Sequence, residues 1–115
     1  MQYLLITYVD EAGWPRLTPE QQQQGLAAYA AFSEALTRDG ALIASGRLQP
    51  SAGARTVRVQ DGRRQILDGP FAETKEVLAG YFLIEAPGLD AAVDWAARCP
   101  ASGHGAVEVR PLWVA

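Results

Sequence analysis

The stretch DGPFAETKE at residues 68–76, together with the apolar run VLAGYFLI at residues 77–84, decides how the chain is organised. Gly69 tolerates a positive φ angle, and Pro70 fixes φ and has no N–H to donate, so neither a helix nor a strand continues through them. Asp68 can cap backbone N–H groups two or three residues further on. Because the following run is apolar at both alternating positions, the sequence predicts a polar elbow that leads into a central, doubly covered strand.

The rest of the chain alternates strand and helix signals. Thr18 and Gln21 have the spacing of a capping box, with Pro19 at the first helical position. Asp61-Gly62 between two alternating runs is a strong hairpin signal. The predicted elements are strands at residues 2–9, 41–46, 77–86 and 106–114, hairpin strands at 56–59 and 64–67, and helices ending near residues 38 and 98.

The two helices are each expected to bury one apolar stripe, because apolar residues recur at helical spacing. In the first helix the stripe is Leu26, Tyr29, Phe32 or Ser33, and Leu36, and in the second it is Leu89, Val93 and Ala96.

Two strand–helix–strand units joined by a hairpin insertion predict one α+β domain, residues 1–115, with a ferredoxin-like βαββαβ sheet. Both helices then lie on one face, and the first and third core strands form the central pair. These two strands are apolar on both faces, so the face without helices would expose a large apolar surface. We therefore expect an isologous homodimer packed through the open sheet face.

Composition narrows the classes of function. A net charge of −3 and a pI of about 5.0 give no electrostatic case for nucleic acid. Cys99 is the only Cys and His104 the only His, so we expect no disulfide, no metal site and no cofactor. No signal peptide and no run approaching the roughly 20 residues of a membrane span are found, so we expect a cytoplasmic protein without a membrane partner.

Three stretches carry a resemblance to a known family. DGPF followed by AETKE, residues 68–76, resembles the signature of the DGPF-domain branch of the YCII-related family. EVRP at residues 108–111 resembles the closing strand of that family, and WAARCP at 95–100 its second-helix ending. The resemblance covers nearly the whole chain and implies a dimeric α/β barrel. Members encoded near extracytoplasmic-function sigma factors imply an accessory role in transcription, with a sigma factor as partner.

The chain departs from one pattern of that family. Some YCII-related proteins carry a His on the first helix and an Asp before the Pro that ends the second, and these are proposed as an acid–base pair. Here residues 21–38 contain no His, and Cys99 stands before Pro100. The pair cannot be carried over, so its activity is not implied for this chain.

Asp68 and His104 are the candidate catalytic residues. Asp68 is either a general base at the mouth of a pocket or only a turn cap, and Asp before Gly-Pro favours the cap. His104 is the only side chain whose unperturbed pKa suits proton transfer near neutrality. It lies between two Gly residues, however, where an exposed His without a function is more common.

The candidate substrate-binding residues are Glu73, Thr74, Lys75, Trp14 and Arg110. The first three belong to the signature and either bind a ligand or form a solvated elbow, and Lys75 or Arg110 would polarise an anionic group. We expect a cleft walled by the sheet, the Asp68 elbow, the loop at residues 10–14 and the His104 loop. The protein is then either a cofactor-independent enzyme acting on a small molecule or a non-catalytic regulatory module.

Overall fold

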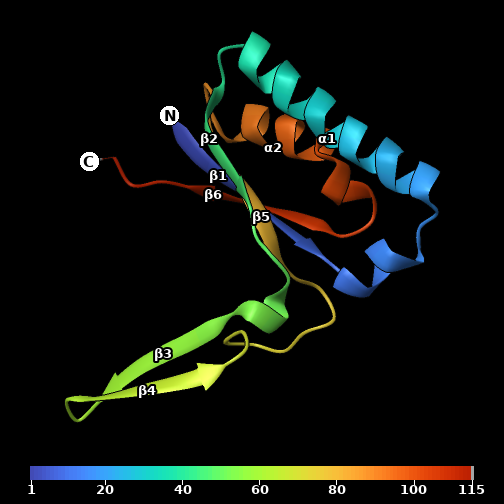
Figure 1. Cartoon of the computed structure of the whole chain (residues 1–115). Coiled ribbons are helices and arrows are strands. Elements are labelled where there is room, and N and C mark those ends of the chain that lie inside the picture. Colours follow the sequence, from blue (N-terminus) through green and yellow to red (C-terminus); the bar gives the residue numbers. More distant parts are fainter. Residues whose placement is uncertain (115) are drawn as a thin grey trace.

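The computed structural model describes residues 1–114 and consists of one helix-covered sheet and one separate hairpin (Figure 1). None of the helices in this range is long and apolar enough to cross a membrane. The elements are β1 (Gln2–Val9), η1 (Glu11–Arg16), α1 (Pro19–Arg38), β2 (Leu42–Arg47), η2 (Ser51–Gly53), β3 (Arg55–Gln60), β4 (Arg63–Asp68), β5 (Val77–Glu85), α2 (Leu89–Arg98), η3 (Pro100–Gly103) and β6 (Ala106–Pro111).

The main sheet has four antiparallel strands in the order β2-β5-β1-β6. Both α1 and α2 lie on one face of it, and the opposite face carries no helix (Figure 1). The predicted ferredoxin-like α+β fold with a hairpin insertion is confirmed, including β1 and β5 as the central pair. The remaining two strands, β3 and β4, form a sheet of their own.

The two faces of β1 are both apolar but differ in burial. Tyr3, Leu5 and Thr7 are buried under the helices, whereas the alternate residues Leu4 and Ile6 are only partly covered. Strand β5 repeats this pattern, with buried Phe82 and Ile84 alternating with exposed Tyr81 and partly covered Leu83. The open sheet face, defined here by the side chains of β1 and β5 that point away from the helices, is therefore apolar in the single chain.

The core lies between the sheet and the helices. Leu5, Leu36 and Ile84 are fully buried there. The ring of Phe32 meets that of Phe82 edge to face, with the ring centres 5.0 Å apart. Such pairs add about 0.5–1.5 kcal/mol beyond the area they bury. Helix α1 is thus held to the sheet through the Phe32–Phe82 ring contact and the burial of Leu36 in the same core.

The predicted start of α1 is confirmed, whereas its predicted buried stripe is confirmed only in part. The capping box is present, with the Gln21 N–H donating to Thr18 Oγ1 and the Thr18 N–H donating to the Gln21 side chain. Phe32, rather than Ser33, is buried with Leu36. Leu26 is 50% exposed, so its place in the stripe is wrong.

The predicted inner face of α2 is also wrong in part. Ala92 and Ala96 are buried, whereas Leu89 and Val93 are 50% and 47% exposed. The helix is turned so that its small residues face the sheet, which lets the helix backbone approach closely. Trp95 then packs beside Phe32 at the edge of the core.

The hairpin β3–β4 is confirmed, and we call it the arm (Arg55–Asp68). Its turn residues Asp61 and Gly62 have φ angles of 52° and 73°, the positive values that a type I′ hairpin turn needs. The arm projects from one end of the sheet, on the side away from the helices (Figure 1). The radius of gyration is 16.1 Å, against about 13 Å expected for a compact chain of this size, because the arm lies outside the body.

Candidate functional site

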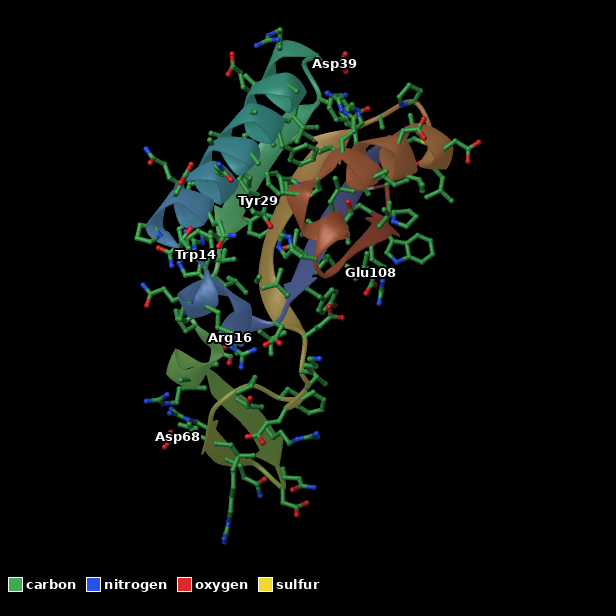
Figure 2. All side chains as sticks on the ribbon, turned by 90° about the vertical axis from the view of Figure 1, so that its right-hand side faces the viewer. Trp14, Arg16, Tyr29, Asp39, Asp68 and Glu108 are labelled. Atoms are coloured by element: carbon green, nitrogen blue, oxygen red, sulfur yellow. The ribbon has the colours of Figure 1, made fainter. Side chains whose placement is uncertain are left out.

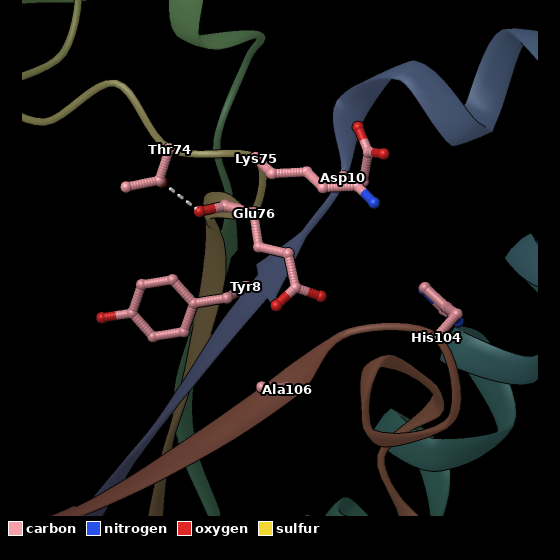
Figure 3. Close-up of a pocket in the computed structure, with 7 residues that line it drawn as sticks. All are labelled: Tyr8, Asp10, Thr74, Lys75, Glu76, His104 and Ala106. Atoms are coloured by element: carbon pink, nitrogen blue, oxygen red, sulfur yellow. Dashed lines mark hydrogen bonds between the residues drawn. The ribbon is translucent and has the colours of Figure 1, made fainter.

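A cavity of about 680 Å³ lies where β1 and η1, the polar elbow before β5, and the His104 loop come together. It is walled by three segments far apart in sequence, and Figure 3 shows their side chains around one space. The lining residues are Tyr8, Asp10, Thr74, Lys75, Glu76, His104 and Ala106.

The end of β1 supplies one wall of this cavity. Tyr8 is opposite Leu78 on β5 and Ala106 on β6, so its ring lies on the open sheet face. Its hydroxyl is 3.4 Å from Oε1 of Glu108, a long hydrogen bond. Asp10 follows the strand and accepts the N–H of Ala12 at 3.0 Å, which caps η1 and fixes the carboxylate at the cavity rim.

The elbow supplies the second wall. The Thr74 hydroxyl donates to the carbonyl of Glu76, so the chain turns tightly around Lys75. In Figure 3 the Lys75 side chain extends towards Asp10, and the Glu76 carboxylate is directed into the space between Tyr8 and His104. Lys75 forms no ion pair with any residue in the described range, so its ammonium group can meet a ligand.

His104 supplies the third wall, from the loop that joins η3 to β6. The backbone N–H of His104 donates to the carbonyl of Ala101 at 3.4 Å, and the backbone N–H of Gly105 donates to the same carbonyl at 2.8 Å. A Cβ on Gly105 would lie 2.0 Å from the Tyr8 carbonyl oxygen, so only glycine fits against β1 here. The glycine thus brings His104 close to the end of β1.

The side chains around the cavity are chemically mixed. One ammonium group, one imidazole, two carboxylates and one phenol face a space in the size range of small-molecule sites. The ammonium and phenol can donate hydrogen bonds to an oxyanion, and the carboxylates and imidazole can take up protons. Within residues 1–114, no three His, Cys, Asp or Glu side chains are grouped so as to hold a metal ion.

The structure separates Asp68 from this cavity. The residue ends β4 on the arm, and Figure 2 shows it far below Tyr29 and Glu108 in the body. Its side chain is 88% exposed, and its carboxylate lies 3.0 Å from Nε of Arg55. The expectation that Asp68 caps the turn is therefore wrong, because the carboxylate pairs with Arg55, and in its own chain the residue does not line the cavity.

The turn at Gly69 is held by backbone groups instead. Gly69 has a φ angle of 100°, its N–H donates to the Ala54 carbonyl at 2.8 Å, and its carbonyl accepts the Thr56 hydroxyl at 2.9 Å. Phe71 lies under the guanidinium of Arg58, 5.0 Å from its ring centre. The first half of the signature thus closes the root of the arm, and the second half builds the cavity.

Three other predicted site residues also lie outside the cavity lining. Glu73 is exposed on the elbow. Trp14 packs 3.4 Å from where a Cβ of Gly25 would stand, and it stacks with Arg47. Arg110 pairs with Glu108 on β6, and this hydrogen bond raises the pKa of its guanidinium. Of the residues predicted to bind or act on a substrate, the structure brings together Thr74, Lys75 and His104.

Cys99 precedes Pro100 at the end of α2, the position where the resemblance led us to look for the acid of a His-Asp pair. It is 1% exposed, as the sequence predicts for a helix-end residue. Burial raises the pKa of its thiol above the ordinary value of 9.0. Burial likewise raises the pKa of Tyr29, helped by the neighbouring Cys99. A protonated thiol beneath the helices is a poor nucleophile, so this position does not replace the missing pair.

Four lining residues were not among the predicted site residues. Asp10 belongs to the loop expected to wall the cleft, Glu76 to the elbow expected either to bind a ligand or to be solvated, and Tyr8 to the first predicted strand. Ala106 has no side-chain chemistry that could mark it. Strand register joins two of them, since Tyr8 and Ala106 are direct partners, and register is set by the folded sheet.

Comparison with known proteins gives the family. Residues 1–114 match the YCII-related domain. A protein of Rhizobium meliloti (strain 1021), "Uncharacterized protein R00369", is 35% identical over 114 residues, which covers 97% of this chain and 92% of that protein.

A solved structure shows the same fold. It is 5-chloro-2-hydroxyhydroquinone dehydrochlorinase (TftG) from Burkholderia phenoliruptrix AC1100, in complex with 2,5-dihydroxybenzoquinone. The TM-score is 0.57 at 14% identity, with 100% of this chain and 96% of that chain covered. At that identity the likeness establishes the fold alone, a ferredoxin-like α+β sheet covered by helices on one face. From the domain match and the relative together, we conclude that this chain belongs to the YCII-related family.

Proposed function

We propose that this protein binds a small, oxygen-rich organic molecule in the cavity at the end of β1, and that His104 moves a proton to or from it. One observation carries the proposal. Lys75, Glu76, His104, Asp10 and Tyr8 come from separate parts of the chain and line one space of about 680 Å³. A solvated elbow would not require this convergence.

The roles follow from the chemistry of each group. The ammonium of Lys75 carries three donors and would hold an anionic or carbonyl oxygen of the ligand. His104 would act as the general base or acid, and the Glu76 carboxylate, which is directed into the space between Tyr8 and His104 (Figure 3), would stabilise the imidazolium. Asp68 remains a predicted catalytic residue, and Asp68→Asn tests whether it contributes from outside the cavity.

The structural neighbour supports a class of ligand. TftG was solved with 2,5-dihydroxybenzoquinone, a small ring with several oxygens. A ring of that size with hydroxyl, oxo or carboxylate groups would find donors in Lys75 and Tyr8 and acceptors in Asp10 and Glu76. We therefore propose hydroxylated or carboxylated rings as the first class to test.

The same proposal includes a homodimer through the open sheet face. Leu78 and Tyr81 on β5 are 47% and 37% exposed, and Leu48 is 47% exposed beside them. An apolar depression of about 180 Å³ lies on this face, lined by Leu4, Ile6, Leu48, Leu78, Gly80 and Tyr81. Apolar patches of this kind on one face mark association surfaces, and a second copy would cover this one by two-fold symmetry.

The sequence offers a direct test of ligand binding. Lys75 is the only Lys and His104 the only His, so labelled lysine and histidine each give one side-chain NMR signal. A library of hydroxylated and carboxylated rings would first be screened by thermal unfolding. A ligand at 100 times its Kd adds about 2.7 kcal/mol, or a Tm rise of about 10 °C. For each hit, we expect both signals to shift.

Two variants sharpen this test. Lys75→Ala should weaken the binding of an anionic ligand about 10-fold or more, since a charge-assisted hydrogen bond is lost. Arg63→Ala, which removes an exposed cation on the arm outside the cavity lining, is the matched control. If hits raise the Tm without moving either signal, or if both variants weaken binding equally, the cavity is not the site. A screen without any stabilising compound in this class would contradict the proposed ligand class.

A regulatory role beside a sigma factor stays a prediction that rests on the resemblance alone. The cytoplasmic location stays a prediction from the sequence pattern, and the DGPF branch within the family stays a prediction from the resemblance.

A further inference from the structure

The arm lacks the cover that a hairpin needs. Its strands pair only with each other, and of their twelve residues only Thr56 is partly covered. A lone two-stranded hairpin is at best marginally stable in water, because one pair of strands cannot shield its own backbone and apolar groups. A surface outside this chain is therefore needed to hold the arm in its extended form.

One face of the arm is suited to such a surface. Val57 is directly opposite Ile66, and Val59 lies two residues along on the same face. These three side chains are 56%, 52% and 67% exposed. Leu67 pairs with Thr56 and points to the other face, whose outer part is occupied by the stack of Arg58 on Phe71. The face of Val57, Val59 and Ile66 is the apolar arm face.

The arm is held at its root rather than loosely tethered. The carboxylate of Glu11 accepts hydrogen bonds from both the backbone N–H and the hydroxyl of Ser51, at 2.7 and 2.8 Å. This joins η1 of the body to η2, which leads into the arm. The Leu48 N–H also donates to the Ala79 carbonyl at 2.8 Å, which ties the incoming chain to β5. The apolar arm face is thus presented in a fixed direction.

Charge separates the arm from the body. The arm contains four Arg and two Asp, a net charge of +2, so the rest of a chain with net charge −3 carries −5. A second copy of this chain therefore offers the arm a body of opposite net charge. Complementary charge favours association and suppresses other orientations.

We propose that the apolar arm face packs against a second copy of this chain, which lies on the open sheet face. The inference rests on the proposed homodimer and adds a second contact between the two copies. In Figure 1 the arm projects on the side of the open face, so a second copy packed on that face would lie next to the arm. By two-fold symmetry, the arm of the second copy would make the same contact with the first. Each six-residue strand is about 20 Å long, so one arm face covers about 200 Å². This supplements a sheet contact, since stable interfaces need about 800 Å² per partner.

The experiment compares single substitutions by sedimentation equilibrium. Ile66→Glu places a charge in the apolar arm face, twice per dimer, and should weaken dimerisation about 100-fold or more. Leu67→Glu changes the adjacent residue on the opposite face, and Leu26→Glu changes a 50% exposed residue of α1 on the far side of the sheet. Both control variants should have the same dimer dissociation constant as the wild type. Circular dichroism confirms that each variant is folded.

Hydrogen exchange gives a second measurement. In the wild-type dimer the β3 and β4 amides should exchange slowly, and dilution or Ile66→Glu should make them fast while β1 and β5 stay protected. Arm amides that exchange fast in an intact dimer, or Ile66→Glu with a wild-type dimer constant, would overturn the arm contact and leave the sheet-face dimer standing. A wild-type protein that stays monomeric at high concentration would overturn both. Ligand-induced shifts at Lys75 and His104 report on the cavity separately.

Discussion

Replacing Gly105 by Ala is the change whose effect the structure defines most sharply. Gly105 lies between His104 and the first residue of β6, pressed against the end of β1. An added Cβ would lie 2.0 Å from the Tyr8 carbonyl oxygen and 3.3 Å from the Val9 Cα. Both are backbone atoms, so no side-chain rotation can relieve the overlap.

The size of the effect follows from the displacement required. Contacts of a Cβ below 3.0 Å are essentially never found, so the loop and β1 must separate by at least 1.0 Å. Tyr8 and Ala106 are the terminal partners of β1 and β6, and strands pair at about 4.8 Å, so their ladder contact would be lost. Overpacking costs about 1–3 kcal/mol, and each lost hydrogen bond about 1 kcal/mol. We expect the free energy of unfolding to fall by about 2–4 kcal/mol.

Urea denaturation at one fixed protein concentration measures this loss. A domain of this size typically has a free energy of unfolding of about 6–17 kcal/mol. The expected loss is a substantial share of it, so the urea concentration at the midpoint should fall clearly. Gly103→Ala is the matched control, since Gly103 ends η3 two residues earlier and a Cβ there meets nothing within 4 Å. The variant should stay within about 0.5 kcal/mol of the wild type. Equal stability of the two variants would show that the loop does not press on β1 as described.

Three further predictions concern separate contacts. Thr18→Ala removes the acceptor for the Gln21 N–H at 3.1 Å and should cost about 1 kcal/mol in urea denaturation, whereas no loss would show that the capping box is unimportant. Asp68→Asn should change stability by less than about 0.5 kcal/mol, because its ion pair with Arg55 is solvent-exposed; a loss above 1 kcal/mol would contradict that assignment. Since burial raises the pKa of the Cys99 thiol, its contribution to stability is complete below pH 9.0 and declines as the pH rises further. Cys99→Ala should flatten this decline in pH-dependent denaturation, and an unchanged slope would count against it.

Local chemistry in the sequence determined most of the elements. The short apolar run of β1, the capping box of α1 and the Asp61-Gly62 turn each depend on neighbours a few residues apart. The order of these elements then allowed a ferredoxin-like sheet with β1 and β5 at its centre, since connection rules leave few alternatives. Lys75 and His104 could also be named as candidates from the sequence, because residue type and count do not depend on the fold.

Tertiary structure alone decided which faces are covered and which side chains meet. Helix α2 presents Ala92 and Ala96 to the sheet because helix packing depends on how closely two backbones approach, and periodicity equally allowed Leu89 and Val93. Asp68 turned towards Arg55 because the cross-strand register of the arm made them partners. The cavity, too, exists only where strand ends and loops distant in sequence converge, and such distances are set by the packed sheet and not by any local stretch.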